Sequence, residues 1–215
     1  MINSIASQLL IIVMLLNFGI LGSSRIRFHI KLIALQGLIL GIIPLLLPER
    51  IEFHNVAVSA VLITSKAIII PMFLMKTVEK VKIKLEVENY ISFTYSVLLG
   101  AAGTTLIFVF SKMLPLAGGH TDIYFVQIAI STIFIAFIVM ISRIKAISHV
   151  IGYLLLENGI LIFGFLISAH IPFSLEFGFL LDLIVGIFIM GIVMNHIDRE
   201  FSSIDITQLK SLRER

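Results

Sequence analysis

The chain has 215 residues, of which 59% are hydrophobic and 13% are charged, and it contains no cysteine. Soluble globular proteins carry about 25% charged residues, so this composition excludes an ordinary soluble domain and indicates an integral membrane protein. The net charge of +3 is small and gives no reason to expect a nucleic-acid partner. Without cysteine, the chain can form no disulfide and can ligate no thiolate zinc or cysteine-bound iron–sulfur cluster.

Seven apolar segments are long enough to cross a bilayer, which takes about 20 helical residues. They run over 4–22, 30–47, 56–75, 90–110, 123–142, 149–168 and 175–195. The loops between them are short and hold most of the charge, so we expect one all-α bundle of about seven transmembrane helices, multi-pass in the cytoplasmic membrane. The N-terminal segment has no basic region and no small-residue cleavage site, which predicts a retained helix and not a signal peptide.

Basic residues alternate between the two predicted sides of the membrane. The loops after the first, third and fifth predicted helices and the C-terminal tail together hold 13 Lys and Arg residues, whereas the other side has Arg50 and Lys112. The positive-inside rule therefore predicts an N-terminus outside and a C-terminus in the cytoplasm.

Glu157 lies inside the sixth predicted helix, eight residues after His149. This spacing corresponds to about 12 Å along a helix, which is near the bilayer midplane. A carboxylate at that depth costs about 2.5–3.5 kcal/mol and is therefore a candidate functional group. Tyr153, one turn earlier, and the adjacent Asn158 can hydrogen-bond either of its protonation states. The pattern predicts a residue that both accepts and releases a proton.

Two further ionisable residues, Lys66 and Asp182, fall inside predicted helices. Asp182 lies about two turns into the last helix, so its depth overlaps that of Glu157 on a neighbouring antiparallel helix. Lys66 lies ten residues before Lys76, about 15 Å from the inner interface, and Pro71 should loosen the helix beside it. We predict a proton relay of Glu157, Asp182 and Lys66. The alternatives are that Asp182 wets the end of a shorter helix and that Lys66 forms a structural ion pair.

All six histidines fall near the ends of predicted helices, at positions 29, 54, 120, 149, 170 and 196. An imidazole at such a position is expected to be wetted by the membrane interface. The alternative is that some of these groups take up or release protons at the mouth of a path, for which His149, His196 and His170 are the candidates.

Two connecting stretches of the sequence resemble each other. One reads SSRIRFHIKLIALQGLILG and the other ISRIKAISHVIGYLLLENGILIFG. Both pass through Ser-Arg-Ile-basic to an amide–glycine pair, Gln36-Gly37 or Asn158-Gly159, so Gln36 joins Asn158 and Tyr153 as a supporting polar residue. A parallel repeat of three-helix units at 1–88 and 122–215, with 89–121 as connector, is allowed. Chance similarity between apolar sequences explains the likeness equally well.

The last three predicted helices resemble the small subunit K of bacterial respiratory complex I. The likeness rests on the basic loop Arg143 to Lys145, the run from Gly152 to Asn158, Asp182 four residues before Gly186, and an Ile-Asp-x-x-x-Leu pattern at 204–209. It implies a relay of two membrane carboxylates. This chain departs from the pattern in two places, because the family's glutamate position holds Leu154, three residues before Glu157, and because Asp replaces Glu at 182.

The whole chain resembles component E of hydrogenase-4 and formate hydrogenlyase complexes, through its length, its four additional N-terminal helices and the run GYLLLENGI. This resemblance implies a membrane-arm subunit that contributes charged residues to proton or cation translocation. Its partners would be antiporter-like membrane subunits and a peripheral hydrogenase arm. The chain would hold no cofactor and would not be catalytic alone, since these partners carry the nickel–iron site and the iron–sulfur clusters. The alternatives are a small subunit of a multisubunit cation/proton antiporter and a purely structural membrane subunit.

Overall fold

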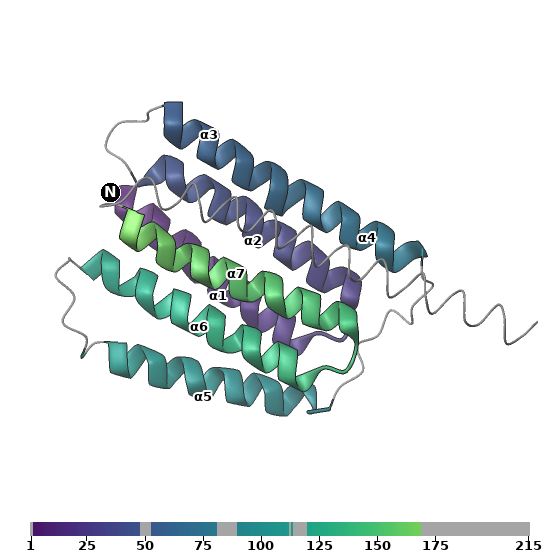
Figure 1. Cartoon of the computed structure of the whole chain (residues 1–215). Coiled ribbons are helices and arrows are strands. Elements are labelled where there is room, and N and C mark those ends of the chain that lie inside the picture. Colours follow the sequence, from purple (N-terminus) through teal and green to yellow (C-terminus); the bar gives the residue numbers. More distant parts are fainter. Residues whose placement is uncertain (1, 48–52, 81–89, 112, 114–119, 169–215) are drawn as a thin grey trace, which may run out of the picture.

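The computed structural model describes residues 2–47, 53–80, 90–111, 113 and 120–168. These residues form long helices that lie side by side in one bundle (Figure 1). The helices are α1 (Ile2–Gly22), α2 (Ile26–Leu46), α3 (Phe53–Leu62), η1 (Ile63–Ile69), α4 (Ile70–Lys80), α5 (Phe93–Ser111), α6 (His120–Ser142) and α7 (Ala146–Ser168). Because α3, η1 and α4 follow one another without a break, they form a single long helix with a π-helical middle.

Six helical segments in the described part are long and apolar enough to cross a membrane. This finding confirms the all-helical, multi-pass membrane architecture predicted from the sequence. The third span is longer than predicted, since the helix continues through its basic end to Lys80, and the second begins at Ile26 and not at residue 30. The seventh predicted span, 175–195, lies outside the described residues.

The bundle has a centre that is flanked by a helix at each of two edges (Figure 1). The centre consists of α1, α2, α6 and α7, with α5 packed against α6 and α1 at one edge. The helix built from α3, η1 and α4 packs against α2 at the opposite edge. This arrangement places η1 beside the central helices, where its side chains can reach their neighbours.

Glycines bring the central helices unusually close to their partners. A Cβ atom added at Gly37 of α2 would lie 2.7 Å from the backbone carbonyl carbon of Lys66 in η1. A Cβ atom added at Gly159 of α7 would lie 3.1 Å from the carbonyl oxygen of Ala129 in α6. Small residues at helix contacts are typical of membrane bundles, because lipid offers no hydrophobic drive for association and packing must supply it.

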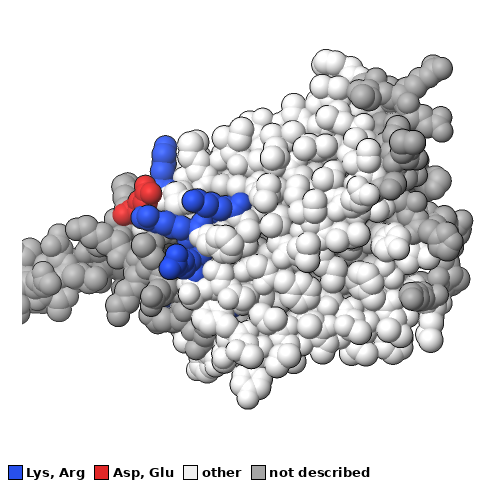
Figure 2. Space-filling view, turned by 180° about the vertical axis from the view of Figure 1, so that it is seen from behind, with Lys and Arg blue, Asp and Glu red and all other residues white. Residues whose placement is uncertain are grey.

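The surface charge of the described residues gathers at one end of the bundle. Figure 2 shows lysines and arginines clustered there, with acidic side-chain atoms beside them and an uncharged surface elsewhere among the described residues of this face. The described basic side chains at this end include Arg25, Arg27, Lys31, Lys76 and Lys145. Such one-sidedness agrees with a membrane-spanning bundle, while its direction of insertion stays a prediction.

Arg143 is buried at this charged end and contacts two neighbouring helices. Its Nη2 atom donates to the carbonyl oxygen of Leu21 at 2.8 Å, at the C-terminal turn of α1, where carbonyls lack intrahelical partners. Its guanidinium carbon lies 4.3 Å from the ring centroid of Phe93, the first residue of α5. Burial lowers the pKa of Arg143 to about 10, which leaves the group charged at pH 7. One side chain thus ties together α1, α5 and the loop between α6 and α7.

Candidate functional site, a buried polar network

Lys66 and Glu157 form an ion pair in the interior of the bundle. The Lys66 Nζ atom lies 3.3 Å from Glu157 Oε1, and the two side chains are only 6% and 3% exposed. Lys66 comes from η1 and Glu157 from α7, each near the middle of its helix. The structure therefore brings together two of the three ionisable residues that the sequence places inside the membrane.

The backbone around Lys66 is π-helical. The N–H of Ile70 bonds to the carbonyl of Ser65, five residues earlier, instead of four as in an α-helix. Pro71 follows directly and has no N–H to donate, so the looser helix predicted beside Lys66 takes the form of this π-helical segment. The Ser65 hydroxyl donates to the carbonyl of Val61 at 2.7 Å. Short π-helical segments occur frequently at functional sites, where they re-aim a side chain.

The ion pair continues into a row of hydrogen bonds across the bundle. Lys66 Nζ donates to Asn158 Oδ1 at 3.3 Å, Asn158 Nδ2 to Gln36 Oε1 at 3.1 Å, Gln36 Nε2 to Asn17 Oδ1 at 2.7 Å, and Asn17 Nδ2 to Thr132 Oγ1 at 2.8 Å. The Thr132 hydroxyl in turn donates to the backbone carbonyl of Ile128 at 2.7 Å. We call Glu157, Lys66, Asn158, Gln36, Asn17 and Thr132 the polar network. Its members come from η1, α7, α2, α1 and α6, and none is more than 6% exposed.

The polar network forms a layer between two apolar cores. One core cluster includes Ile20, Ile33, Leu74, Ile135 and Leu155, and the other includes Val13, Ile39, Leu62, Ile128 and Leu161. On each helix, the network residue lies in sequence between a member of the first cluster and a member of the second. The six polar side chains are therefore at a common depth, with apolar packing above and below them. Because these six side chains are buried among the described helices, their polar groups depend on one another.

Among the six members of the polar network, only the ion pair can take part in acid–base chemistry. The three amides and the Thr132 hydroxyl carry no charge and do not titrate near neutral pH. Lys66 and Glu157 are close enough to exchange a proton between Nζ and Oε1. Among the described residues, no group of three or more His, Cys, Asp or Glu side chains is placed to hold a metal ion.

Glu157 faces Lys66 although it is displaced from the glutamate position in the subunit K pattern that the sequence resembles. That position holds Leu154, which is 5% exposed and belongs to an apolar core cluster. A residue three positions later lies almost one turn further along α7, at the level of Lys66. The displacement from the subunit K pattern therefore coincides with the presence of a lysine partner on η1.

Other residues singled out from the sequence lie around the network or outside the described part. Tyr153 is half-buried on α7, one turn before Glu157. His149 is exposed near the charged end, as expected for an interfacial histidine, with Nδ1 3.1 Å from the carbonyl oxygen of Lys145. The expectation of a wetted imidazole is wrong for His29, which is 1% exposed because the turn before α2 covers it, with Nε2 3.0 Å from the carbonyl oxygen of Ser23. Asp182, His170 and His196 lie outside the described residues.

Sequence reasoning missed two members of the network, Asn17 and Thr132. Asn17 carried a usable signal, since an amide alone in an apolar span must find a partner from another helix. Thr132 carried none, because a threonine hydroxyl in a helix can always be satisfied by the carbonyl four residues earlier. Its role becomes visible only once α1 and α6 are known to be neighbours.

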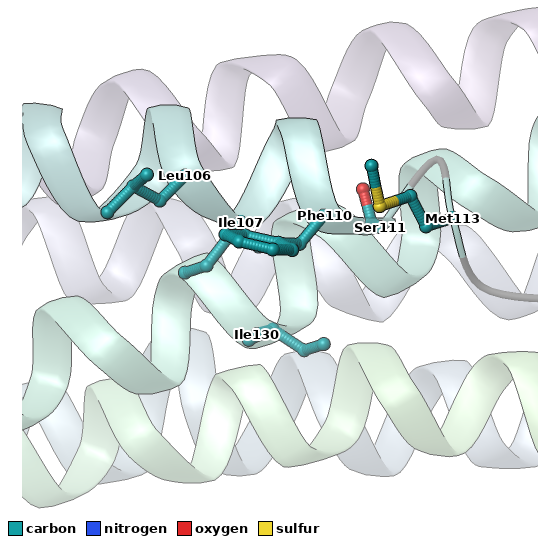
Figure 3. A pocket seen from close by; sticks show the side chains of 6 residues that line it. All are labelled: Leu106, Ile107, Phe110, Ser111, Met113 and Ile130. Carbon is teal, nitrogen blue, oxygen red and sulfur yellow. The ribbon is translucent and has the colours of Figure 1, made fainter.

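A pocket of about 400 Å³ lies away from the network, where the C-terminal part of α5 meets α6 (Figure 3). It is lined by Leu106, Ile107, Phe110, Ser111, Met113 and Ile130. The lining carries no ionisable group, and its one hydroxyl, on Ser111, already donates to the carbonyl of Phe108 at 3.1 Å. This pocket therefore offers no acid–base chemistry.

Together, the helical spans and the buried ion pair define a multi-pass membrane protein with an ionisable site inside its bundle. The chain is 28% identical over 191 residues to the Mycobacterium tuberculosis protein named "Uncharacterized protein Rv0085", and the match covers 88% of this chain and 87% of that relative. No family profile matches the sequence. No solved structure matches it either. The similarity to the mycobacterial protein extends over most of the chain and is not confined to one motif.

Proposed function

We propose that the protein is a membrane-arm subunit of a complex-I-related hydrogenase, of the hydrogenase-4 or formate hydrogenlyase type, and that it contributes to translocation of protons or another cation. The observation that carries this proposal is the Lys66–Glu157 ion pair, almost fully buried at mid-bundle. The resemblance of the whole chain to component E supports the kind of complex. Redox chemistry in the partner subunits would change the charge or hydration around the pair and so move its proton.

A purely structural role gives a weaker account of the pair. Taking two charges out of water costs several kcal/mol per ion, and replacing such pairs by apolar residues is often neutral or even stabilising by about 1–4 kcal/mol. A bundle that only needed to be stable could hold apolar side chains at both positions. Ionisable residues inside membrane segments instead mark proton and ion paths as a rule. From the sequence alone, Asp182 is the candidate for the next group on such a path.

The test is to replace Glu157 by glutamine in the assembled complex. Glu157→Gln keeps the size of the side chain and its hydrogen-bonding capacity but removes the ionisable group. We expect the complex to assemble and to keep hydrogenase activity, while proton transport coupled to that activity is lost. Measurement of redox-driven proton uptake in vesicles checks this, and normal coupling in a fully assembled variant would overturn the proposal.

Gln127→Leu is a matched control for this experiment. Gln127 is buried on α6 and donates to Ser111 of α5 at 2.7 Å, outside the polar network. Its replacement also removes a buried polar contact between two helices but leaves the ion pair intact. Coupling should therefore stay normal in Gln127→Leu.

The structural role remains the second candidate, because the network's hydrogen bonds join five helical segments. If these bonds serve assembly alone, Glu157→Gln should lower the yield of intact complex, and the complex that remains should couple normally. A separate experiment distinguishes a hydrogenase complex from a multisubunit antiporter as the assembly that contains this chain. The chain is purified through a tag, and the proteins that come with it are analysed. A hydrogenase complex brings nickel and hydrogen-dependent electron transfer with it, whereas a cation/proton antiporter brings neither.

A further inference from the structure

The row of hydrogen bonds from Lys66 to Ile128 has a single direction. The ammonium group of Lys66 can only donate, and the backbone carbonyl of Ile128 can only accept. Each amide between them must turn its oxygen toward the donor side and its NH2 group toward the acceptor side. All five bonds follow this order, with the amide oxygens of Asn158, Gln36 and Asn17 on the side of Lys66. The charge at one end thus sets the orientation of every group up to the other end.

Loss of a proton from the ion pair removes this constraint. The pair then carries one net negative charge, with a neutral amine on Lys66 whose N–H can serve Glu157 and whose lone pair can face Asn158. An NH2 group now interacts better with the pair than a carbonyl oxygen does. Each amide can reverse by a half-turn of its terminal torsion, which exchanges oxygen and nitrogen without moving the helix.

The far end of the row can follow such a reversal. The Thr132 hydroxyl rotates freely and can donate to Asn17 instead of to the carbonyl of Ile128. That carbonyl keeps a partner, since it accepts the backbone N–H four residues later within α6. Neither helix α1 nor α6 has to shift for Thr132 to change its acceptor.

We infer that Asn158, Gln36 and Asn17 transmit the protonation state of the Lys66–Glu157 pair to Thr132, on the other side of the bundle. The network then has two orientations, one for the neutral pair and one for the negatively charged pair. This inference rests on the proposed function in one respect, namely that the pair exchanges protons during turnover. It names Asn17 and Thr132 as positioning residues that respond to the pair without touching it.

Among the described residues, the groups beside the pair come from the helices packed around it. On α7, Tyr153 lies one turn before Glu157, and on α2 the neutral residues Gln36 and Gly37 lie against η1. Helices α1 and α6 bring Asn17 and Thr132 into the layer. Within the described part of the chain, the amide row therefore begins at the Lys66–Glu157 pair and runs away from it.

Solid-state NMR of the full-length protein in lipid bilayers, with ¹⁵N-labelled Asn and Gln, tests the inference directly. Lys66→Met removes the donor at the start of the row, whereas Lys66→Arg keeps a cation that can only donate. We expect the side-chain amide resonances of Asn17 to shift or split in Lys66→Met and to stay in place in Lys66→Arg. Unchanged Asn17 resonances in a folded Lys66→Met protein, beside a shifted Asn158, would overturn the inference.

A second pair of variants changes Thr132, at the end of the row opposite Lys66, and leaves both charged residues in place. Thr132→Val has the same shape but no hydroxyl, and Thr132→Ser keeps the hydroxyl. The side-chain resonances of Asn158 should shift in Thr132→Val and remain in Thr132→Ser. Equal spectra for the two variants would contradict a connected row, even if Lys66→Met failed to fold.

These spectra do not depend on transport, so the two proposals can fail separately. If the amide resonances shift as expected but the Glu157→Gln complex still transports protons normally, the inference stands and the proposed function is wrong. If the amide resonances do not shift but Glu157→Gln loses coupled proton transport, the proposed function stands and the inference is wrong.

Discussion

Helices α5 and α7 satisfy their polar side chains in opposite ways. On α5, the hydroxyls of Ser96, Thr104 and Thr105 each donate to a carbonyl of the same chain three or four residues earlier. On α7, Glu157 and Asn158 reach side chains of η1 and α2. A hydroxyl can be satisfied by its own helix, whereas an amide or a charge requires a neighbour. Amides and charges, and not hydroxyls, therefore show where helices of this bundle are joined by directed bonds.

The two helices also differ in burial. Of the residues in the apolar span, 17% are buried on α5 and 61% on α7. The outer face of α5 exposes large apolar residues such as Leu98, Leu99 and Phe110. We conclude that α5 is held mainly by apolar contacts at the edge, whereas α7 is fixed by packing and by the polar network together.

The largest expected effect is the loss of one partner of the ion pair. Lys66→Met removes the cation that lies 3.3 Å from the buried Glu157 carboxylate, which should lower the free energy of unfolding by about 3–5 kcal/mol. The double variant Lys66→Met with Glu157→Leu removes both charges and should recover most of that loss. Unfolding in bicelles, monitored by circular dichroism, measures both values. A double variant as unstable as the single one would show that the charges are not the cause.

A smaller effect is expected from crowding the contact between α2 and η1. In Gly37→Ala, the added Cβ atom meets the backbone of Lys66 at 2.7–2.8 Å, so the helices must separate. Overpacking of this kind costs about 1–3 kcal/mol. Gly22→Ala is the matched control, since the nearest atom to its Cβ would be Val97 Cγ2 at 3.7 Å. Equal stability of the two variants would place no tight contact at Gly37.

The smallest effect is expected on the outer face of α5. Thr105 is exposed, and its hydroxyl donates to the carbonyl of Ala101 within the same helix at 2.8 Å. Thr105→Val should change the free energy of unfolding by less than about 0.5 kcal/mol, as is usual for surface sites. The same unfolding measurement on Thr132→Val should give a clearly larger loss, because that hydroxyl accepts a bond from another helix. Similar losses in the free energy of unfolding for the two variants would contradict the conclusion that polar side chains matter more at the centre than at the edge.

Much of the fold could be predicted from the sequence because hydropathy reports directly on what a bilayer requires. The six described spans lie where apolar runs of sufficient length predicted them, and Lys66 and Glu157 lie near the middle of their helices, as counting residues indicated. The π-helical segment also had a local cause in Pro71. These features depend on the composition or on neighbours within a few residues.

The composition of the site could not be predicted in the same way, because it depends on which helices become neighbours. The sequence offered both Asp182 and Lys66 as groups that could act with Glu157. The structure pairs Glu157 with Lys66, from a helix far away in the chain, and Asp182 lies outside the described residues. The two amide–glycine pairs, noticed as similar sequences, contact each other through Gln36 and Asn158 at 3.1 Å. The role of Asn17 became visible only in the structure, where it bonds to Gln36 of α2 and Thr132 of α6. In lipid, small residues and polar contacts decide such adjacency, and neither leaves a regular pattern in sequence.

The common depth of the polar network has a consequence for how energy can reach it. The membrane potential does work on a charge only as the charge moves along the membrane normal, about 2.3 kcal/mol per elementary charge per 100 mV for a full crossing. A proton that passes between Lys66 and Glu157 moves within one layer, across the helices and not along them. Voltage therefore adds almost nothing to this step. The driving force for this step must therefore come from changes of charge or hydration within the layer, in the plane of the membrane.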